Sequence, residues 1–502
     1  MNFLESLRDV LRWARRLLWG FVCIVCLNAA NAQEALKVVV HWDQTIAVSK
    51  STPTLQVVTN PPLRPGEPLG VSAYKAVKDL GADYVRYVPW LPYPRLAVAE
   101  LEPPTPQKTS WDFSLIDPMT KEFLAATEGH PTVINFSTMP AWLFKTDAPV
   151  KYPDDPNKPT WDYTQGREER DPTDKEIGDY YARIVSWYVA GEFTDENGVR
   201  HESGYHYKFP VWEVLNEPEG EHEMTPEQYT RRYDAIVSAI QKVSPETKFM
   251  GLGLGNPSME PGYFEYFLDK KDHIPGIPID YISYHFYATP AAGEGVNEWQ
   301  YTFFDQADGF LNTVRYVEEI RKRLSPTTKT DLDELGIILP TDNKDGDNAP
   351  PPAAYWNLCG SLYAYLYIAL SRMQIDLIGM SQLVGYPTQF PSVSMMDWTN
   401  NRPNARYWVL KLIKDSFHAG DRLVVTSISS RVVVAQGFVT EGGRKLLLAN
   451  KRNYSVEVAL PDAEKASTLT VDATTDDGPA RAAKPTDGKI RLGPFAVAVV
   501  SW

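Results

Sequence analysis

The stretch Val211-Trp212-Glu213-Val214-Leu215-Asn216-Glu217-Pro218 has the pattern of a buried strand that leads directly into a helix. Valine and tryptophan favour strands, and proline is common in the first turn of a helix. The stretch therefore predicts one βα unit, with Asn216 and Glu217 at the carboxyl end of the strand. Taken alone, Asn-Glu-Pro is explained equally well as an ordinary helix start.

Similar units repeat from about residue 52 to residue 417, where short apolar runs alternate with amphipathic ones. Eight such pairs predict a (β/α)8 TIM barrel, whose active site lies at the carboxyl ends of the strands. Strand seven is unusually polar for a buried parallel strand. We place the strands at 54–59, 83–88, 132–137, 211–216, 247–253, 279–285, 330–335 and 376–383. We place the helices at 68–80, 113–128, 174–193, 226–244, 260–271, 302–325, 353–373 and 403–417.

Beyond residue 418 the helical period gives way to short β-rich runs separated by turn-forming segments. This pattern predicts an antiparallel β-sandwich. Leu36 to Val48 is also strand-like, and we assign it to the same domain. The predicted fold is therefore an α/β barrel (52–417) with an accessory antiparallel β-sandwich domain (33–51 plus 418–502).

Residues 1–32 have the pattern of a signal peptide: four arginines precede the apolar run 17–27, and Ala30-Asn31-Ala32 follows it. We expect cleavage near Ala32 and a secreted or periplasmic protein. The run is too short to span a bilayer, so no stable membrane anchor is expected. Mass spectrometry of the exported protein would find a chain that starts at Gln33. A chain that starts at Met1 would favour an envelope-tethered scaffold.

The formal net charge is −14, and removal of a signal peptide with four arginines and two acidic residues would bring it near −16. Such acidity argues against nucleic acid and anionic membranes as partners and is compatible with neutral sugars. Cys359 is the one cysteine outside the predicted signal peptide. No internal disulfide is therefore expected, and Cys359 is predicted to be a packing residue.

A second carboxylate complements Glu217. Glu334, in Thr330-Asp331-Leu332-Asp333-Glu334-Leu335-Gly336, falls at the end of strand seven, whereas Glu217 ends strand four. Glycoside hydrolysis requires two carboxyl groups that flank one bond, so the pair predicts this chemistry. In isolation, Glu334 would be interpreted as a solvated loop acid. By strand alternation, Asp333 is expected to point to the opposite face from Glu334.

Several segments carry a resemblance to glycoside hydrolase family 39, within the larger clan of retaining (β/α)8 glycosidases. The resemblance spans roughly residues 40 to 500 and is most specific around Glu217. It implies that Glu217 is the general acid/base and Glu334 the nucleophile. The segments occur in that family's order: 111–117, 131–136, 139–142, 212–218 and 282–287.

The resemblance also implies roles for residues around the two acids. Asn216 would bind the sugar 2-hydroxyl, and Arg86, at the end of strand two, would pair with Glu334. His285 and Tyr287, at the end of strand six, would bind substrate and orient the nucleophile. The alternatives are a structural ion pair for Arg86 and ordinary core packing for the histidine. The histidines show no metal-ligand spacing, and neither a metal nor a cofactor is expected.

Tryptophans are the candidate sugar platforms, although core packing explains each of them equally well. Trp142, Trp161 and Trp299 follow strands three and six. Strand eight ends in Met380-Ser381-Gln382 and lacks the tryptophan that often floors the site in the family. Trp398 and Tyr386 are the candidates to replace it.

The leading hypothesis is a secreted retaining glycoside hydrolase that acts on an oligosaccharide or polysaccharide, with β-xylosidase-like exo action. An endo-acting hydrolase of exopolysaccharide is the alternative within the resemblance. A non-catalytic carbohydrate-binding protein is the alternative from a different class. The presence of both acids together with Asn216 argues against that last alternative.

Overall fold

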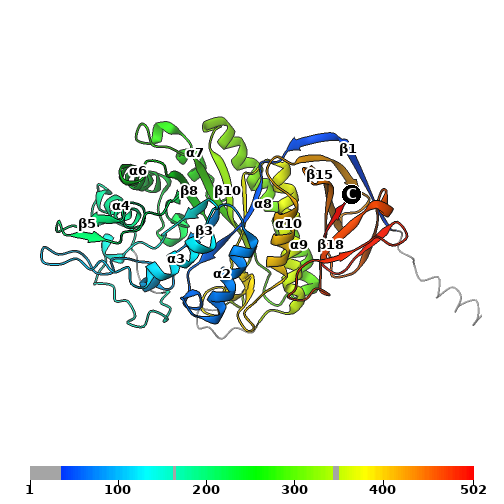
Figure 1. Cartoon of the computed structure of the whole chain (residues 1–502). Helices are drawn as coiled ribbons and strands as arrows, with labels where there is room; N and C mark the ends of the chain where they lie inside the picture. The colour runs from blue at the N-terminus through cyan, green and yellow to red at the C-terminus, as the bar shows by residue number, and fades with distance from the viewer. Residues whose placement is uncertain (1–34, 162–165, 343–349) are drawn as a thin grey trace, which may run out of the picture.

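The computed structural model describes residues 35–161, 166–342 and 350–502. The predicted signal peptide lies outside the described residues. Within those three ranges, no helix is both long and apolar enough to cross a membrane. Figure 1 shows a barrel wrapped by helices beside a β domain that carries the C-terminus.

The barrel is closed by eight parallel strands that follow one another in chain order. Every predicted strand is present, which confirms the (β/α)8 fold. The strands are β2 (Thr52–Val58), β3 (Val85–Val88), β4 (Thr132–Ile134), β7 (Val211–Glu213), β8 (Lys248–Leu254), β9 (Tyr281–Ala288), β10 (Lys329–Ile337) and β11 (Leu377–Met380).

Helices cover the outside of the barrel (Figure 1). Each predicted helix is present: α2 (Pro68–Leu80), α3 (Ile116–Ala126), α4 (Lys175–Val189), α6 (Pro226–Val243), α7 (Pro261–Phe267), α8 (Val296–Leu324), α9 (Ala353–Arg372) and α10 (Ala405–Ser416). Helix α8 begins earlier than predicted, where Glu298 caps the first turn by accepting from the Gly295 N–H at 3.0 Å. Short elements without a prediction are α5 (Pro218–Glu221), β5 (Glu192–Thr194), β6 (Arg200–Glu202), β12 (Met396–Asp397) and β13 (Arg402–Pro403).

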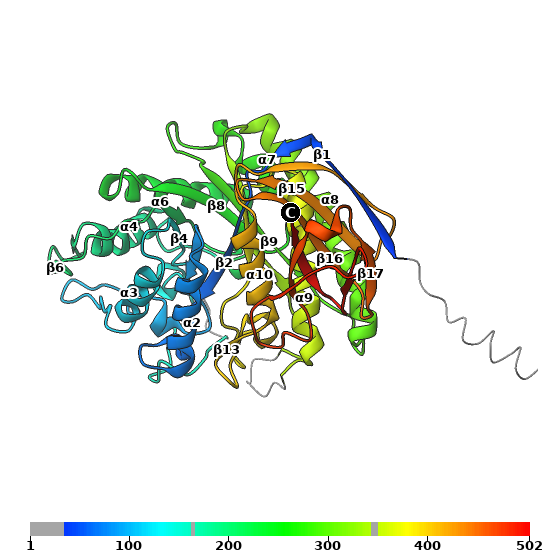
Figure 2. The same ribbon diagram turned by 45° about the vertical axis from the view of Figure 1, so that its right-hand side comes forward.

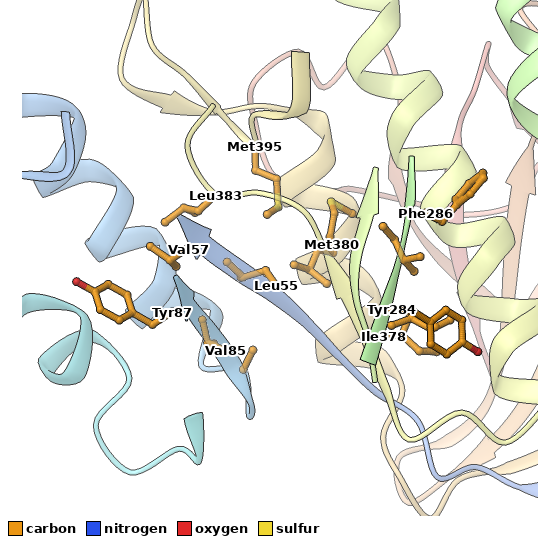
Figure 3. Packing of buried hydrophobic residues seen from close by; sticks show 14 of the residues in the cluster. Leu55, Val57, Val85, Tyr87, Tyr284, Phe286, Ile378, Met380, Leu383 and Met395 are labelled. Atoms are coloured by element: carbon orange, nitrogen blue, oxygen red, sulfur yellow. The ribbon is translucent and has the colours of Figure 1, made fainter. Parts of the chain in front are cut away.

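Alternate side chains of strand β3 point to opposite sides, one towards the apolar core and the other towards the site. On β3, Val85 and Tyr87 belong to the apolar core between strands and helices, which Figure 3 shows from close by. The Tyr87 ring stacks on Phe123 of α3 with centroids 4.5 Å apart. Arg86, between the two, must then point into the barrel. Burial of the apolar side chains thus fixes the direction of the polar one.

The β domain is a separate unit of nine strands in the order β19-β18-β21-β16-β15-β14-β1-β17-β20. Strand β1 (Leu36–Val48) joins its two halves, because Leu36 pairs with β17 and the residues from Val38 onward pair with β14. A second apolar core fills the space between the halves. The other strands are β14 (Arg422–Ile428), β15 (Val433–Thr440), β16 (Gly443–Asn450), β17 (Val456–Ala459), β18 (Ser467–Val471), β19 (Arg481–Ala483), β20 (Lys489–Leu492) and β21 (Val497–Ser501).

The β domain packs against helices α9 and α10 (Figure 2). Phe417 and Phe438 meet there with ring centroids 4.3 Å apart. Ser361 Oγ, on α9, donates to the Asn450 carbonyl at 2.8 Å. Cys359 is buried on the same helix, and burial raises the pKa of its thiol to about 12. It is therefore a packing residue, as predicted.

Candidate active site

The chain after β7 holds Glu217 in a constrained backbone position. Strand β7 ends at Glu213, earlier than predicted, and Leu215 (φ 65°) and Glu217 (φ 40°) adopt left-handed conformations. Such residues cost about 1–3 kcal/mol each and persist where the surroundings fix them. The Glu217 N–H donates to the Gly253 carbonyl at 2.9 Å. A Cβ on Gly255 would lie 2.7 Å from the Glu217 carboxylate, so glycine provides its space.

Glu334 is held by two donors on β3 and β9. Arg86 Nη1 donates to Glu334 Oε1 at 2.5 Å, and the Tyr287 hydroxyl donates to Oε2 at 2.5 Å. The Glu334 side chain is 10% exposed, against 31% for Glu217. Charge-assisted hydrogen bonds to both oxygens fix the orientation of this carboxylate. The structure thus brings Arg86 and Tyr287 to the residue that they were predicted to orient.

His285 lies between the two acids. Its Nδ1 is 2.9 Å from Glu217 Oε1 and 3.6 Å from Glu334 Oε2. Burial alone lowers the pKa of His285, but Glu334 and Asp333 raise it well above its ordinary value. Ligand atoms of Glu217, His285 and Glu334 all lie within 4.8 Å of one another, close enough to hold a metal ion. All three side chains already have partners within the protein, which explains their proximity without a metal.

Arg86 connects the residues at the base of the site. Its side chain is 1% exposed and contacts acceptors from β2, from β7 and the segment that follows it, and from β10. Nη2 donates to Asn216 Oδ1 at 2.8 Å, and Nη1 also donates to Gln56 Oε1 at 2.7 Å. Nε donates to Glu213 Oε2 at 2.5 Å. Arg86 therefore fixes Asn216 and Glu334 relative to one another.

The prediction that Asp333 points to the opposite face from Glu334 is wrong. Strand β10 has a register shift between Asp331 and Glu334 in its pairing with β9, and another in its pairing with β11. A bulge of this kind disrupts the alternation and turns consecutive side chains to one face. Asp333 Oδ2 consequently lies 3.0 Å from Arg86 Nε, and Oδ1 lies 3.6 Å from His285 Nε2.

Two more buried acids, Glu213 and Asp331, lie beneath the site, and the sequence analysis did not single them out. Burial raises the pKa of Glu213 to about 7, although Arg86 opposes this rise. Burial and the charges of Asp333 and Glu213 raise the pKa of Asp331 well above its ordinary value. Arg86 and His285 lower the pKa of Asp333 despite its burial. The polar pattern of strand seven reflects this interior network.

A pocket of about 340 Å³ opens above these acids. One wall is aromatic: the Trp90 ring lies 5.7 Å from Trp161 and 6.2 Å from Phe390, between centroids. Among the described residues that line the pocket there is no lysine or arginine. The polar side chains that line it are Gln56, Asn216, Glu217, Glu221, Tyr287, Glu334 and Gln382.

The structure does not bring Trp142, Trp299 or Trp398 to the lining of this pocket. Trp142 Nε1 donates to the Glu100 carbonyl at 2.8 Å, away from the two acids. Trp299 is 9% exposed on α8, where it packs into the core. Trp398 packs against the same core. Trp161 is the one predicted platform on the pocket wall, and no sequence signal distinguished it from the others.

Glu221, the last residue of α5, is a pocket residue that the sequence analysis missed. Its Oε1 accepts from Trp90 Nε1 at 2.6 Å and from Asn216 Nδ2 at 2.8 Å. Burial and the neighbouring Glu217 raise the pKa of Glu221 to about 8. It therefore connects the aromatic wall to Asn216, and its carboxyl keeps its proton to a higher pH than an ordinary glutamate does.

The Glu221→Gln variant is expected to lose less stability than the wild type as pH rises. An unfolded chain releases this proton near the ordinary pKa of 4.5, whereas the folded protein keeps it up to about 8. Stability is thus lost between these values, and glutamine cannot ionise. Between about pH 5 and pH 8, the unfolding free energy measured by urea denaturation should fall by on the order of 2 kcal/mol less in the variant than in the wild type.

Glu223→Gln is the matched control, because Glu223 is exposed on the same loop and pairs with Arg167. It should keep the pH dependence of the wild type. If Glu221→Gln also kept the pH dependence of the wild type, the raised pKa assigned to Glu221 would be contradicted.

Two segments of the chain match the sequence models of known protein families. Residues 171–337 match the sequence model of glycosyl hydrolases family 39, a range that contains Glu217, His285 and Glu334. The match confirms the resemblance to that family. Residues 430–500 match the C-terminal immunoglobulin-like domain of D-apionate lactonase. A search of curated protein sequences finds no match to the chain.

Solved structures show the same architecture at low identity. A GH39 β-xylosidase from Caulobacter crescentus has a TM-score of 0.58 and 13% identity, over 92% of this chain and 99% of that one. An α-L-arabinofuranosidase from Thermotoga maritima has a TM-score of 0.57 and 16% identity, over 93% and 100%. A glucosidase from Croceicoccus marinus has a TM-score of 0.57 and 13% identity, over 93% and 98%. At these identities the likeness establishes the fold alone.

Proposed function

We propose that this protein, a glycosidase of the family 39 type, cleaves its substrate with retention of configuration by double displacement. In the first step, Glu334 attacks the anomeric carbon while Glu217 transfers its proton to the departing oxygen. In the second step, Glu217 takes a proton from water, whose oxygen displaces Glu334 from the sugar. Both side chains then return to their starting states.

The spacing of the two carboxyl groups carries this proposal. Oxygen atoms of Glu217 and Glu334 lie within 4.8 Å of one another, from strands four and seven of the barrel. Retaining glycosidases hold their carboxyl groups about 5–5.5 Å apart, whereas inverting ones leave about 6.5–9.5 Å for a water molecule. The spacing leaves no room for that water. A non-catalytic sugar-binding protein would not require two acids at this distance.

The neighbours of the acids support the assigned roles. Asn216 Oδ1 accepts from Arg86, and its Nδ2 donates to Glu221, so the amide orientation beside Glu217 is fixed. A hydrogen bond between Asn216 and a sugar 2-hydroxyl would become stronger as charge develops at the anomeric centre. Tyr287 orients the attacking oxygen of Glu334 by its hydrogen bond.

Pocket size and charge support exo action on a neutral sugar. At about 340 Å³ the pocket is near the lower end for ligand sites, which suits a chain end better than a long internal segment. The carboxylate of a uronate in it would lie near Glu334 and would find no lysine or arginine in the described lining to pair with it. Arg86 is already engaged by protein acceptors. Exo action would release single sugars from an oligosaccharide, whereas an endo enzyme would release fragments of mixed length.

Neutral aryl glycosides are therefore expected to be better substrates than uronides. The aryl β-xyloside, β-glucoside and β-glucuronide have the same ring configuration. They differ at C5, where the xyloside carries hydrogen, the glucoside a hydroxymethyl group and the glucuronide a carboxylate. We expect kcat/KM for the glucuronide to be at least about 100-fold below that for the better neutral substrate, because a carboxylate buried without a cationic partner costs several kcal/mol. Preferred hydrolysis of the glucuronide would contradict the neutral-sugar assignment. Inactivity towards a wide panel of aryl glycosides and polysaccharides would instead contradict the proposed function.

A further inference from the structure

A second cavity, of about 650 Å³, lies between the barrel helices α8 and α9 and the strands β14 and β15 of the β domain. Figure 2 shows both helices beside the β domain. None of its lining residues lines the pocket that contains Glu217. It is therefore a separate feature, formed where the two domains meet.

Four cationic side chains line this interdomain cavity: Arg315, Arg372, Arg431 and Lys451. Across the described ranges, none of them has a carboxylate oxygen within 4.0 Å. Where they have polar partners, these are neutral: Arg315 Nη1 donates to Asn312 Oδ1 at 2.6 Å, and Arg372 Nε donates to Gln436 Oε1 at 2.6 Å. The chain as a whole has a net charge of −14, so this cluster of four cations is a local region of the opposite sign.

The single acid in the lining, Asp308, accepts the hydroxyl hydrogen bond of Tyr365 and can offset only one of the four positive charges. Lys451 Nζ lies over the Tyr365 ring, 4.8 Å from its centroid. Burial, together with Arg452 and Arg431, lowers the pKa of Lys451, although Asp308 opposes this shift. The cations thus repel one another, and a bound anion would relieve this repulsion.

The rest of the lining defines what kind of anion fits. The floor is aliphatic, from side chains such as Leu311, Ile368 and Val434, and these suit the C–H faces of sugar rings. Tyr365 is the single aromatic side chain in the lining, and Lys451 covers one of its faces. A single-stranded nucleic acid would use exposed rings for base stacking, and the acidic chain as a whole would repel any nucleic acid.

We propose that this interdomain cavity is a non-catalytic binding site for an acidic oligosaccharide, whose carboxylates pair with Arg315, Arg372, Arg431 and Lys451 while its rings lie on the aliphatic floor. The site is independent of the pocket that contains Glu217. It would hold a charged part of a glycan, whereas the active site takes a neutral sugar.

Isothermal titration calorimetry with oligogalacturonate tests the site. Its methyl ester has the same backbone without the charges and should not bind measurably. The Arg315→Glu/Arg431→Glu double variant changes two exposed residues and should weaken oligogalacturonate binding at least about tenfold. Raising NaCl from about 0.02 M to about 0.5 M should weaken binding by the wild type.

Lys322→Glu/Arg323→Glu is the matched control, because it makes the same charge change on α8 outside the cavity. It should alter affinity less than about twofold. Hydrolysis of aryl glycosides should be unchanged in both double variants. Absence of binding by the wild type, equal weakening in both variants, or equal binding of the methyl ester would each overturn the proposal. Inorganic phosphate that binds as tightly as oligogalacturonate would assign the cavity to a small anion instead.

Discussion

Replacement of Glu334 by alanine is expected to lower kcat/KM by at least about 10⁴-fold, because the group that forms the glycosyl-enzyme is lost. Neither Asp333 nor Glu213 is free to replace it. Asp333 lies between Arg86 and His285, and Glu213 is fully buried against Arg86. Steady-state hydrolysis of an activated aryl glycoside measures the loss. Glu319→Ala, an exposed acid paired with Lys322 on α8, should keep near-normal turnover.

A loss of rate alone does not show whether Glu334 or Asp333 is the nucleophile. An Asp333→Asn variant should also be slow, because Asp333 contacts Arg86, which in turn holds Glu334. Trapping separates them: a 2-deoxy-2-fluoro derivative of an accepted substrate should label the protein by one sugar. Peptide mass spectrometry should place that sugar on Glu334. A sugar on Asp333 would show that the nucleophile is misassigned.

Replacement of Glu217 by alanine should slow substrates with poor leaving groups by about 10²–10⁴-fold and activated aryl glycosides far less in the first step. The reason is that an activated phenolate departs without a proton, whereas a sugar alkoxide does not. A series of aryl glycosides with leaving groups of graded basicity measures this difference.

Azide provides the control for the same variant. Without the Glu217 side chain, azide can enter the second step in place of base-activated water, and turnover of activated substrates should rise with formation of a glycosyl azide. Glu223→Ala, which lies outside the pocket lining, should show neither effect. Equal losses for all leaving groups, with no rescue by azide, would indicate a structural role for Glu217.

The fold was predictable because local signals agree along the chain. Most barrel strands and helices follow from their period, although strand seven is unusually polar. Leu36 to Val48 lies in one sheet with the C-terminal strands. The short β5 and β6 hairpin was not predicted. Its formation depends on packing such as the Phe193 ring against Trp111, with centroids 4.9 Å apart, rather than on a strong strand pattern.

The centre of the site was partly predictable, and its surroundings were not. Strand counting places Glu217 and Glu334 at facing strand ends. In the structure Glu217 follows β7 and Glu334 lies within β10, with ligand atoms within 4.8 Å of one another. The bulge in β10 breaks the alternation on which the Asp333 prediction depended, and no residue pattern announced it. Glu221 was missed because a charged residue after a proline is typical of any exposed helix start. A glutamate inside the buried run 211–215 was a signal for the interior acid network that could have been used.

Proton NMR of the first-formed sugar tests double displacement most directly, because the anomeric configuration is recorded before mutarotation mixes the two forms. Two successive inversions, one by Glu334 and one by water, return the starting configuration. The enzyme should therefore release first the anomer that its substrate contained. Initial release of the opposite anomer would mean that water attacks directly and would contradict the retaining mechanism.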